Sequence, residues 1–213
     1  MNRKLFEYIA ASPSPYHAVE RSAEMLRQAG FLPLSEGEDW QLSPGQGYYV
    51  TRNGSSLIAF RARRAFTGFM MTAAHSDSPT FKLKENPELT GSGCRRLAVE
   101  RYGGMIMSSW MDRPLGIAGR VLLRKGRGVE TRLLDLGGHC AVIPNVAIHM
   151  NRKINDGYTW NPAVDLLPLW GSGEEKGFFR PTVAMALACR EEDILATDLA
   201  LYNPQKGVEW NGL

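Results

Sequence analysis

The chain has few of the features that mark secreted or membrane proteins. Its three cysteines, Cys94, Cys140 and Cys189, are far apart, odd in number and form no CxxC pair. This argues against a disulfide framework, and we expect a reducing, cytoplasmic location. No stretch approaches the roughly 18 apolar residues of a membrane-spanning helix, and the N-terminal residues lack the apolar core of a signal peptide. No membrane association is expected.

A strong charge of one sign is also missing. The 213 residues include 25 Lys and Arg against 22 Asp and Glu, a net charge of +3. The basic clusters near residues 61–64 and 124–127 are short, and aromatic residues do not alternate with them as in a stacking platform. We therefore expect no nucleic-acid binding. With 44% hydrophobic and 22% charged residues, the composition is that of an ordinary globular protein.

The first 80 residues have the pattern of an α/β segment. Residues 2–10 and 16–29 predict helices, the second ended by Gly30. Residues 47–63 predict a β-hairpin around Asn53-Gly54, a pair that suits a type I′ turn. Residues 67–74 are apolar almost throughout, which is typical of a strand buried on both faces in a parallel sheet.

The pattern then changes to short strands separated by glycine-rich turns. Strands are predicted at 80–84, 96–101, 118–124 and 130–135, followed by a helix over 182–190 and a strand over 197–203. The fold class is α/β, with a β-rich domain over 81–175 inserted in an α/β domain formed by 1–80 and 176–213. The few predicted helices cannot cover both faces of a parallel sheet. We therefore expect this α/β domain to be incomplete.

Two polar residues follow the predicted buried strand in 70-MMTAAHSDSPTFKLK-84. His75 is of a residue type that commonly binds zinc, and Asp77 could orient it by accepting the second ring N–H. The HxD pattern alone leaves two alternatives open. His75 is either a metal ligand or a polar residue at the end of a strand.

Other candidates are weaker. His149 lies in 143-IPNVAIHMNR-152, where its side chain could point either way. Asp112-Arg113 is read as an ion pair or a turn, and Glu174-Glu175 as a solvated linker. The common catalytic patterns HExxH, GxSxG, the P-loop and GxGxxG do not occur.

Five segments, in order, resemble the N-terminal half of a family M18 metallo-aminopeptidase of the aspartyl aminopeptidase group. They are 10-AASPSPYHAV-19, 74-AHSDSP-79, 98-AVERYGGMIMSSWMDRPLGIAGRV-121, 143-IPNVAIHMNRKIN-155 and 193-DILATDLALYN-203. Together they extend over nearly the whole chain. Several ordered matches are far more specific than a single HxD pattern.

The resemblance implies a partial zinc-peptidase-like α/β catalytic domain with an inserted β-rich dimerisation domain. It implies removal of N-terminal residues, preferably Asp or Glu, from peptides by two divalent ions of zinc type, with cobalt or manganese as alternatives. It also implies a homo-oligomer in which dimers build a dodecamer. His75 would be the first metal ligand, Asp77 would orient it, and His149 would help to bind substrate in the neighbouring subunit.

The departure from the family pattern lies at the C-terminal side. The family's bridging Asp, its Glu-Glu pair, a later Asp ligand and a final His all belong to the C-terminal half, which this sequence does not contain. We therefore expect the isolated chain to be an inactive N-terminal fragment that needs the missing C-terminal half. The alternative is a non-catalytic binding or assembly module that retains the dimerisation domain.

Overall fold

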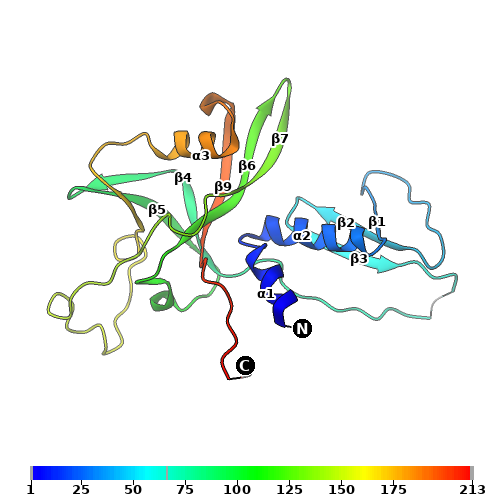
Figure 1. Ribbon diagram of the computed structural model, residues 1–213, viewed down its shortest axis with the longest axis horizontal. Helices are drawn as coiled ribbons and strands as arrows, with labels where there is room; N and C mark the ends of the chain where they lie inside the picture. Colours follow the sequence, from blue (N-terminus) through cyan, green and yellow to red (C-terminus); the bar gives the residue numbers. More distant parts are fainter. Residues whose placement is uncertain (1, 66, 212–213) are drawn as a thin grey trace. The chain divides into compact units, whose positions relative to one another are not determined.

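A computed structural model describes residues 2–65 and 67–211 (Figure 1). The chain divides into two compact units, an N-terminal unit (Met1–Ser78) and a six-stranded unit (Pro79–Leu213). Helices and two separate β-sheets make up the fold, so the predicted α/β class is confirmed. No helix in the described residues is long and apolar enough to cross a membrane.

The N-terminal unit begins with two helices, α1 (Asn2–Ala10) and α2 (Pro15–Gln28). The sequence sets the start of α2 because Ser14 caps it, accepting from the His17 backbone N–H, and Pro15 occupies the first helical turn. Gly30, with a φ of +79°, follows its end. The buried face of α2 consists of Ala18, Val19 and Ala23.

The β-hairpin forms as predicted in this unit. Strand β2 (Gly47–Arg52) pairs with β3 (Ser56–Arg61) in antiparallel register, and the short β1 (Leu32–Pro33) adds to β2 in parallel. Asn53 and Gly54 have φ values of 54° and 64°, the left-handed pair that a type I′ turn requires. Tyr48, Tyr49 and Val50 of β2 are buried.

The predicted strand over 67–74 is wrong. These residues have irregular backbone, and none of them pairs with another strand in the described chain. Met70 and Met71 are 103% and 86% exposed. The physical reason is that a strand is held by ladder hydrogen bonds to a neighbour, and the described residues provide none here.

The six-stranded unit is built on an antiparallel sheet of order β7-β6-β9-β4-β5-β8. Each predicted strand of this region is present, and most are longer than predicted. The strands are β4 (Thr80–Gly91), β5 (Cys94–Tyr102), β6 (Gly116–Lys125), β7 (Gly128–Asp135), β8 (Leu169–Ser172) and β9 (Ile194–Tyr202). Two short 3-10 helices, η1 (Met107–Trp110) and η2 (Glu191–Asp193), join them.

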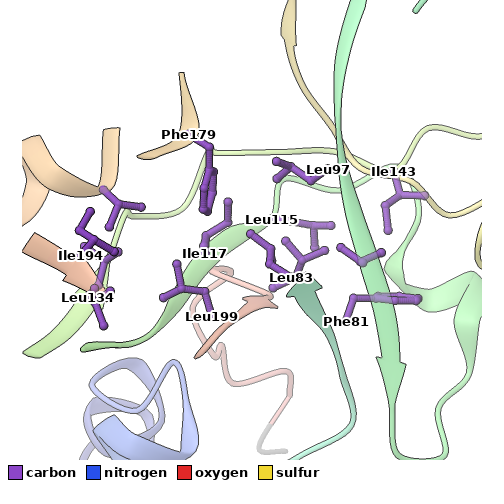
Figure 2. Packing of buried hydrophobic residues seen from close by; sticks show 14 of the residues in the cluster. Phe81, Leu83, Leu97, Leu115, Ile117, Leu134, Ile143, Phe179, Ile194 and Leu199 are labelled. Carbon is purple, nitrogen blue, oxygen red and sulfur yellow. The ribbon is translucent and has the colours of Figure 1, made fainter. Parts of the chain in front are cut away.

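One apolar core fills this unit (Figure 2). Alternate residues of the strands supply it, as the period of two requires. Helix α3 (Phe179–Leu187) adds Phe179 and Val183. The helix starts earlier than predicted because Pro181 fits its first turn. The fully buried members are Phe81, Leu97, Leu115, Ile117, Val121, Ile143, Leu166, Val183 and Leu199, and Leu201 is nearly so.

The placement of the last strand differs from the expectation. The prediction from the sequence places 176–213 in the α/β domain together with 1–80. In the structure, β9 lies between β6 and β4 in the six-stranded sheet. Leu199 and Leu201 alternate into the core of that sheet, and this pins the register. Residues 179–202 are therefore structural parts of the unit that contains 81–175.

Candidate metal and substrate site

His75 and Asp77 are in direct contact in the N-terminal unit. The distance between His75 Nδ1 and Asp77 Oδ1 is 2.9 Å. The His75 side chain is 90% exposed, whereas that of Asp77 is 31% exposed. When Nδ1 carries the proton and donates to the carboxylate, Nε2 has a free lone pair directed away from the pair. This is the arrangement by which a carboxylate orients a histidine that binds a metal.

A serine fixes the position of this pair. Ser76, between His75 and Asp77, donates its hydroxyl to the backbone oxygen of Ser55 at 2.8 Å. Ser55 lies in the turn of the β2–β3 hairpin, directly after Asn53-Gly54. The hairpin turn therefore holds the segment that carries the candidate ligand.

The number of ligands is the critical property of this site. A zinc site in an enzyme has typically three protein ligands and one open position. In residues 2–65 and 67–211, no three His, Cys, Asp or Glu side chains lie close enough together to hold a metal ion. The donor chemistry of His75, with Asp77 behind it, fits one ligand position of such a site and no more.

His149 lies in the six-stranded unit, on the long connection between β7 and β8. It belongs to a turn in which the Met150 N–H donates to the Ala147 oxygen at 2.8 Å. The turn is exposed, and so are the apolar neighbours Val146, Ile148 and Met150. Connections this long without regular structure are uncommon in compact domains and are often functional.

Asp112 turns out to be a hydrogen-bond acceptor for this connection. Its Oδ1 accepts from the Asn145 backbone N–H at 2.8 Å, and its Oδ2 accepts from the Asn145 side-chain amide at 2.6 Å. These bonds lower the pKa of Asp112, the backbone bond most. Of the two alternatives left open for Asp112-Arg113, the turn is the one observed, with Asp112 in the left-handed region at φ 56°.

The Glu174-Glu175 segment is exposed, in agreement with the linker prediction. It is nevertheless attached to the sheet. Glu174 accepts from the Gly93 N–H at 2.9 Å, and Glu88 accepts from the N–H groups of Gly177 and Phe178, each at 2.9 Å. These carboxylates bind backbone of the same unit, which is a structural use.

Sequence reasoning missed the partners that support these sites. Ser55 and Asn145 lie 21 and 33 residues from the side chains that they contact. A local pattern cannot reveal such pairs. The turn signal at Asn53-Gly54 predicts the hairpin turn that contains Ser55, but it does not predict the hydrogen bond from Ser76 to this turn.

Comparison with known proteins identifies the family. Residues 8–210 match the family described as aminopeptidase I zinc metalloprotease (M18). The chain belongs to the M18 family. Among curated relatives, a probable M18 family aminopeptidase 2 from Clostridium acetobutylicum is 41% identical over 215 residues, covering 96% of this chain and 50% of that protein. One from Pseudomonas entomophila is 40% identical over 215 residues, with the same coverage.

Solved structures share the fold. The mApe1 structure from Chaetomium thermophilum has a TM-score of 0.84 at 27% identity and covers 96% of this chain and 51% of that chain. The mApe1 dodecamer of S. cerevisiae has a TM-score of 0.75 at 25% identity, with 97% and 48% covered. This M18 chain thus spans about half the length of the relatives that it matches.

Proposed function

We propose that this chain supplies the first ligand and a substrate-binding residue of an M18 metallo-aminopeptidase. The observation that carries the proposal is the His75–Asp77 pair at 2.9 Å, held to the hairpin through Ser76. His75 would bind a zinc ion through Nε2. Asp77 would fix the ring orientation and make the imidazole a stronger donor.

When bound, zinc-type ions polarise the scissile carbonyl and lower the pKa of water towards neutrality. We propose two ions, as the family resemblance implies, with cobalt or manganese as alternatives to zinc. The contribution of this chain is geometric. Asp77 holds one imidazole in one tautomer and one orientation, so that the ligand does not need to be ordered when the ion binds.

One histidine cannot hold a catalytic zinc ion, since such sites need about three protein ligands. We propose that the remaining ligands and the general base come from residues equivalent to the other half of the relatives' length. The 213 residues by themselves would then be inactive. This agrees with the lack of a cluster of three metal-binding side chains in the described part of the chain.

The proposed substrates are peptides with N-terminal Asp or Glu, and the proposed state is a homo-oligomer of dimers, up to a dodecamer. Exposed Val146, Ile148 and Met150 around His149 support an interface at this turn, because apolar side chains clustered on a surface mark interaction sites. His149 would reach the active site of the neighbouring copy from residues 81–175, the proposed dimerisation domain. The proposed location is the cytoplasm.

Substitution of His75 tests the proposal, with His139 as a matched control. Both histidines are exposed, and His139 has no part in the proposed site. The catalytic half would be supplied as a second polypeptide, and zinc content and hydrolysis of an Asp-anilide would be measured. His75→Ala should lose zinc and at least about 100-fold in activity, while His139→Ala keeps both. Unchanged zinc content and activity in His75→Ala would refute the proposal.

A further inference from the structure

Just before the His149 turn, the connection is joined to the core at Ile143. Met111 forms a bridge with Ile143, and the Asp112 N–H donates to the Ile143 oxygen at 2.9 Å. Ile143 is fully buried and Met111 nearly so. Two residues later, both carboxylate oxygens of Asp112 receive hydrogen bonds from Asn145. Beyond Asn145 the chain runs into the exposed turn of His149.

The backbone of Asp112 shows that this contact is specifically built. A non-glycine residue at φ 56° is in the left-handed region, which is unfavourable for an ordinary side chain and less so for Asp or Asn. Such a conformation persists only where the surroundings enforce it. Here three hydrogen bonds to residues 143 and 145 do so.

His149 is four residues beyond Asn145, so its position depends on the direction in which the chain leaves Asn145. The intervening residues reach at most about 14 Å, and the turn at Ala147–Met150 shortens that path. A substrate-binding group displaced by about 1 Å can lose about 100-fold in rate. The anchor at Asn145 therefore controls how accurately His149 can be presented.

We propose that Asp112 is a positioning residue for His149, acting by holding Asn145 and thus the start of the exposed turn. This inference rests on the proposed role of His149 in binding substrate. It assigns to Asp112 no contact with substrate or metal.

Two substitutions separate the carboxylate from the backbone conformation. Asp112→Gly keeps the positive φ accessible but removes both acceptors. Asp112→Asn also tolerates that φ, and its carbonyl oxygen still accepts from the Asn145 backbone N–H. Its NH₂ group can donate to the Asn145 side-chain oxygen if the Asn145 amide rotates. Asp165→Asn is the matched control. Asp165 accepts from the Asn161 N–H at 2.8 Å and from the Tyr158 hydroxyl at 3.2 Å in the same connection, away from the His149 turn.

The first measurement is amide hydrogen exchange in the 213-residue chain, which requires no activity. In Asp112→Gly, the exchange rate at residues 145–150 should rise about tenfold or more. This is the loss of protection expected when hydrogen bonds to a charged acceptor are removed. Asp112→Asn and Asp165→Asn should leave it unchanged, and strands β4–β9 should keep their protection in all three. Equal exchange at 145–150 in Asp112→Gly, or exchange raised throughout the sheet, would overturn the inference.

The second measurement uses any preparation with aminopeptidase activity, either the chain alone or the chain with the catalytic half supplied. Asp112→Gly should raise KM at least about tenfold, Asp112→Asn should restore it, and Asp112→Gly should add nothing in a His149→Ala background. If His149→Ala is harmless, the proposed role of His149 fails. If His149→Ala is harmful but Asp112→Gly is not, the positioning role fails.

Discussion

The two units of the chain differ in how completely they bury their apolar residues. The six-stranded unit has a continuous core that includes large side chains such as Phe81 and Phe179. The N-terminal unit buries a few residues of α2 and β2, and it leaves Phe69, Met70 and Met71 exposed. The unit with the candidate metal ligand therefore has the smaller apolar core, and the unit with His149 has the larger one.

The strongest test of this difference is to separate the units. Residues 79–211 expressed alone should give a cooperative thermal transition and dispersed amide resonances, since their core is complete. Residues 1–78 alone should give neither, because so small a unit with a thin core is marginal. A cooperative transition in 1–78 together with an unfolded 79–211 would reverse the comparison.

Truncating apolar residues should give a large effect in one unit and none in the other. Phe81 is fully buried, so Phe81→Ala should destabilise the chain by about 3–5 kcal/mol. Met70 is fully exposed, and Met70→Ala should change the free energy of unfolding by less than about 0.5 kcal/mol. Urea unfolding of the 213-residue chain measures both. A cost for Met70→Ala near that of Phe81→Ala would contradict the exposed state of residues 67–74.

Two glycines offer a matched comparison of the backbone in the two sheets. A Cβ at Gly119 in β6 would overlap the backbone oxygen of Asp198 in β9, where no flexible side chain can move aside. Gly119→Ala should cost about 3 kcal/mol. At Gly54 in the hairpin a Cβ would meet no atom within 4 Å, although φ is 64°. Gly54→Ala should cost only about 1 kcal/mol, and chemical denaturation should show this ranking.

The smallest effect concerns two carboxylates with lowered pKa values. Glu36 in the N-terminal unit is lowered chiefly by its hydrogen bonds with Arg52, and Asp112 by those from Asn145. In both cases the stabilisation is present above the ordinary pKa and is lost as the pH falls through the lower pKa of the folded state.

Salt should distinguish the two carboxylates in an NMR titration. It screens the exposed Glu36–Arg52 ion pair, so about 0.5 M NaCl should raise the pKa of Glu36 towards its usual range. The Asn145 donors are neutral, so the pKa of Asp112 should stay low. Equal salt dependence for both would argue against the neutral-donor explanation.

The sequence predicted local structure well and partnerships poorly. Ser14-Pro15 set the start of α2 and Asn53-Gly54 formed the hairpin turn, because capping and turn chemistry act within a few residues. The apolar run at 67–74 has the composition of a strand but has no pairing partner in the described chain. The prediction groups β9 with residues 1–80, whereas β9 pairs with β6. The composition of a strand does not reveal which sheet it will join.

The candidate site shows the same division. The His75–Asp77 contact could be predicted, because two residues is a distance over which a carboxylate reaches an imidazole. The links from Ser76 to Ser55 and from Asp112 to Asn145 could not be predicted, since they depend on tertiary structure. The roles of His75, Asp77 and His149 in catalysis stay predictions.

We propose that this chain holds one ligand of a zinc site that other residues must complete. The most direct measurement is hydrolysis of an Asp- or Glu-anilide by the purified 213-residue chain with saturating zinc, beside His75→Ala. We predict no turnover above the zinc blank in either protein. Zinc-dependent turnover in the unmodified chain that His75→Ala abolishes would contradict the account, because the site would then be complete within these 213 residues.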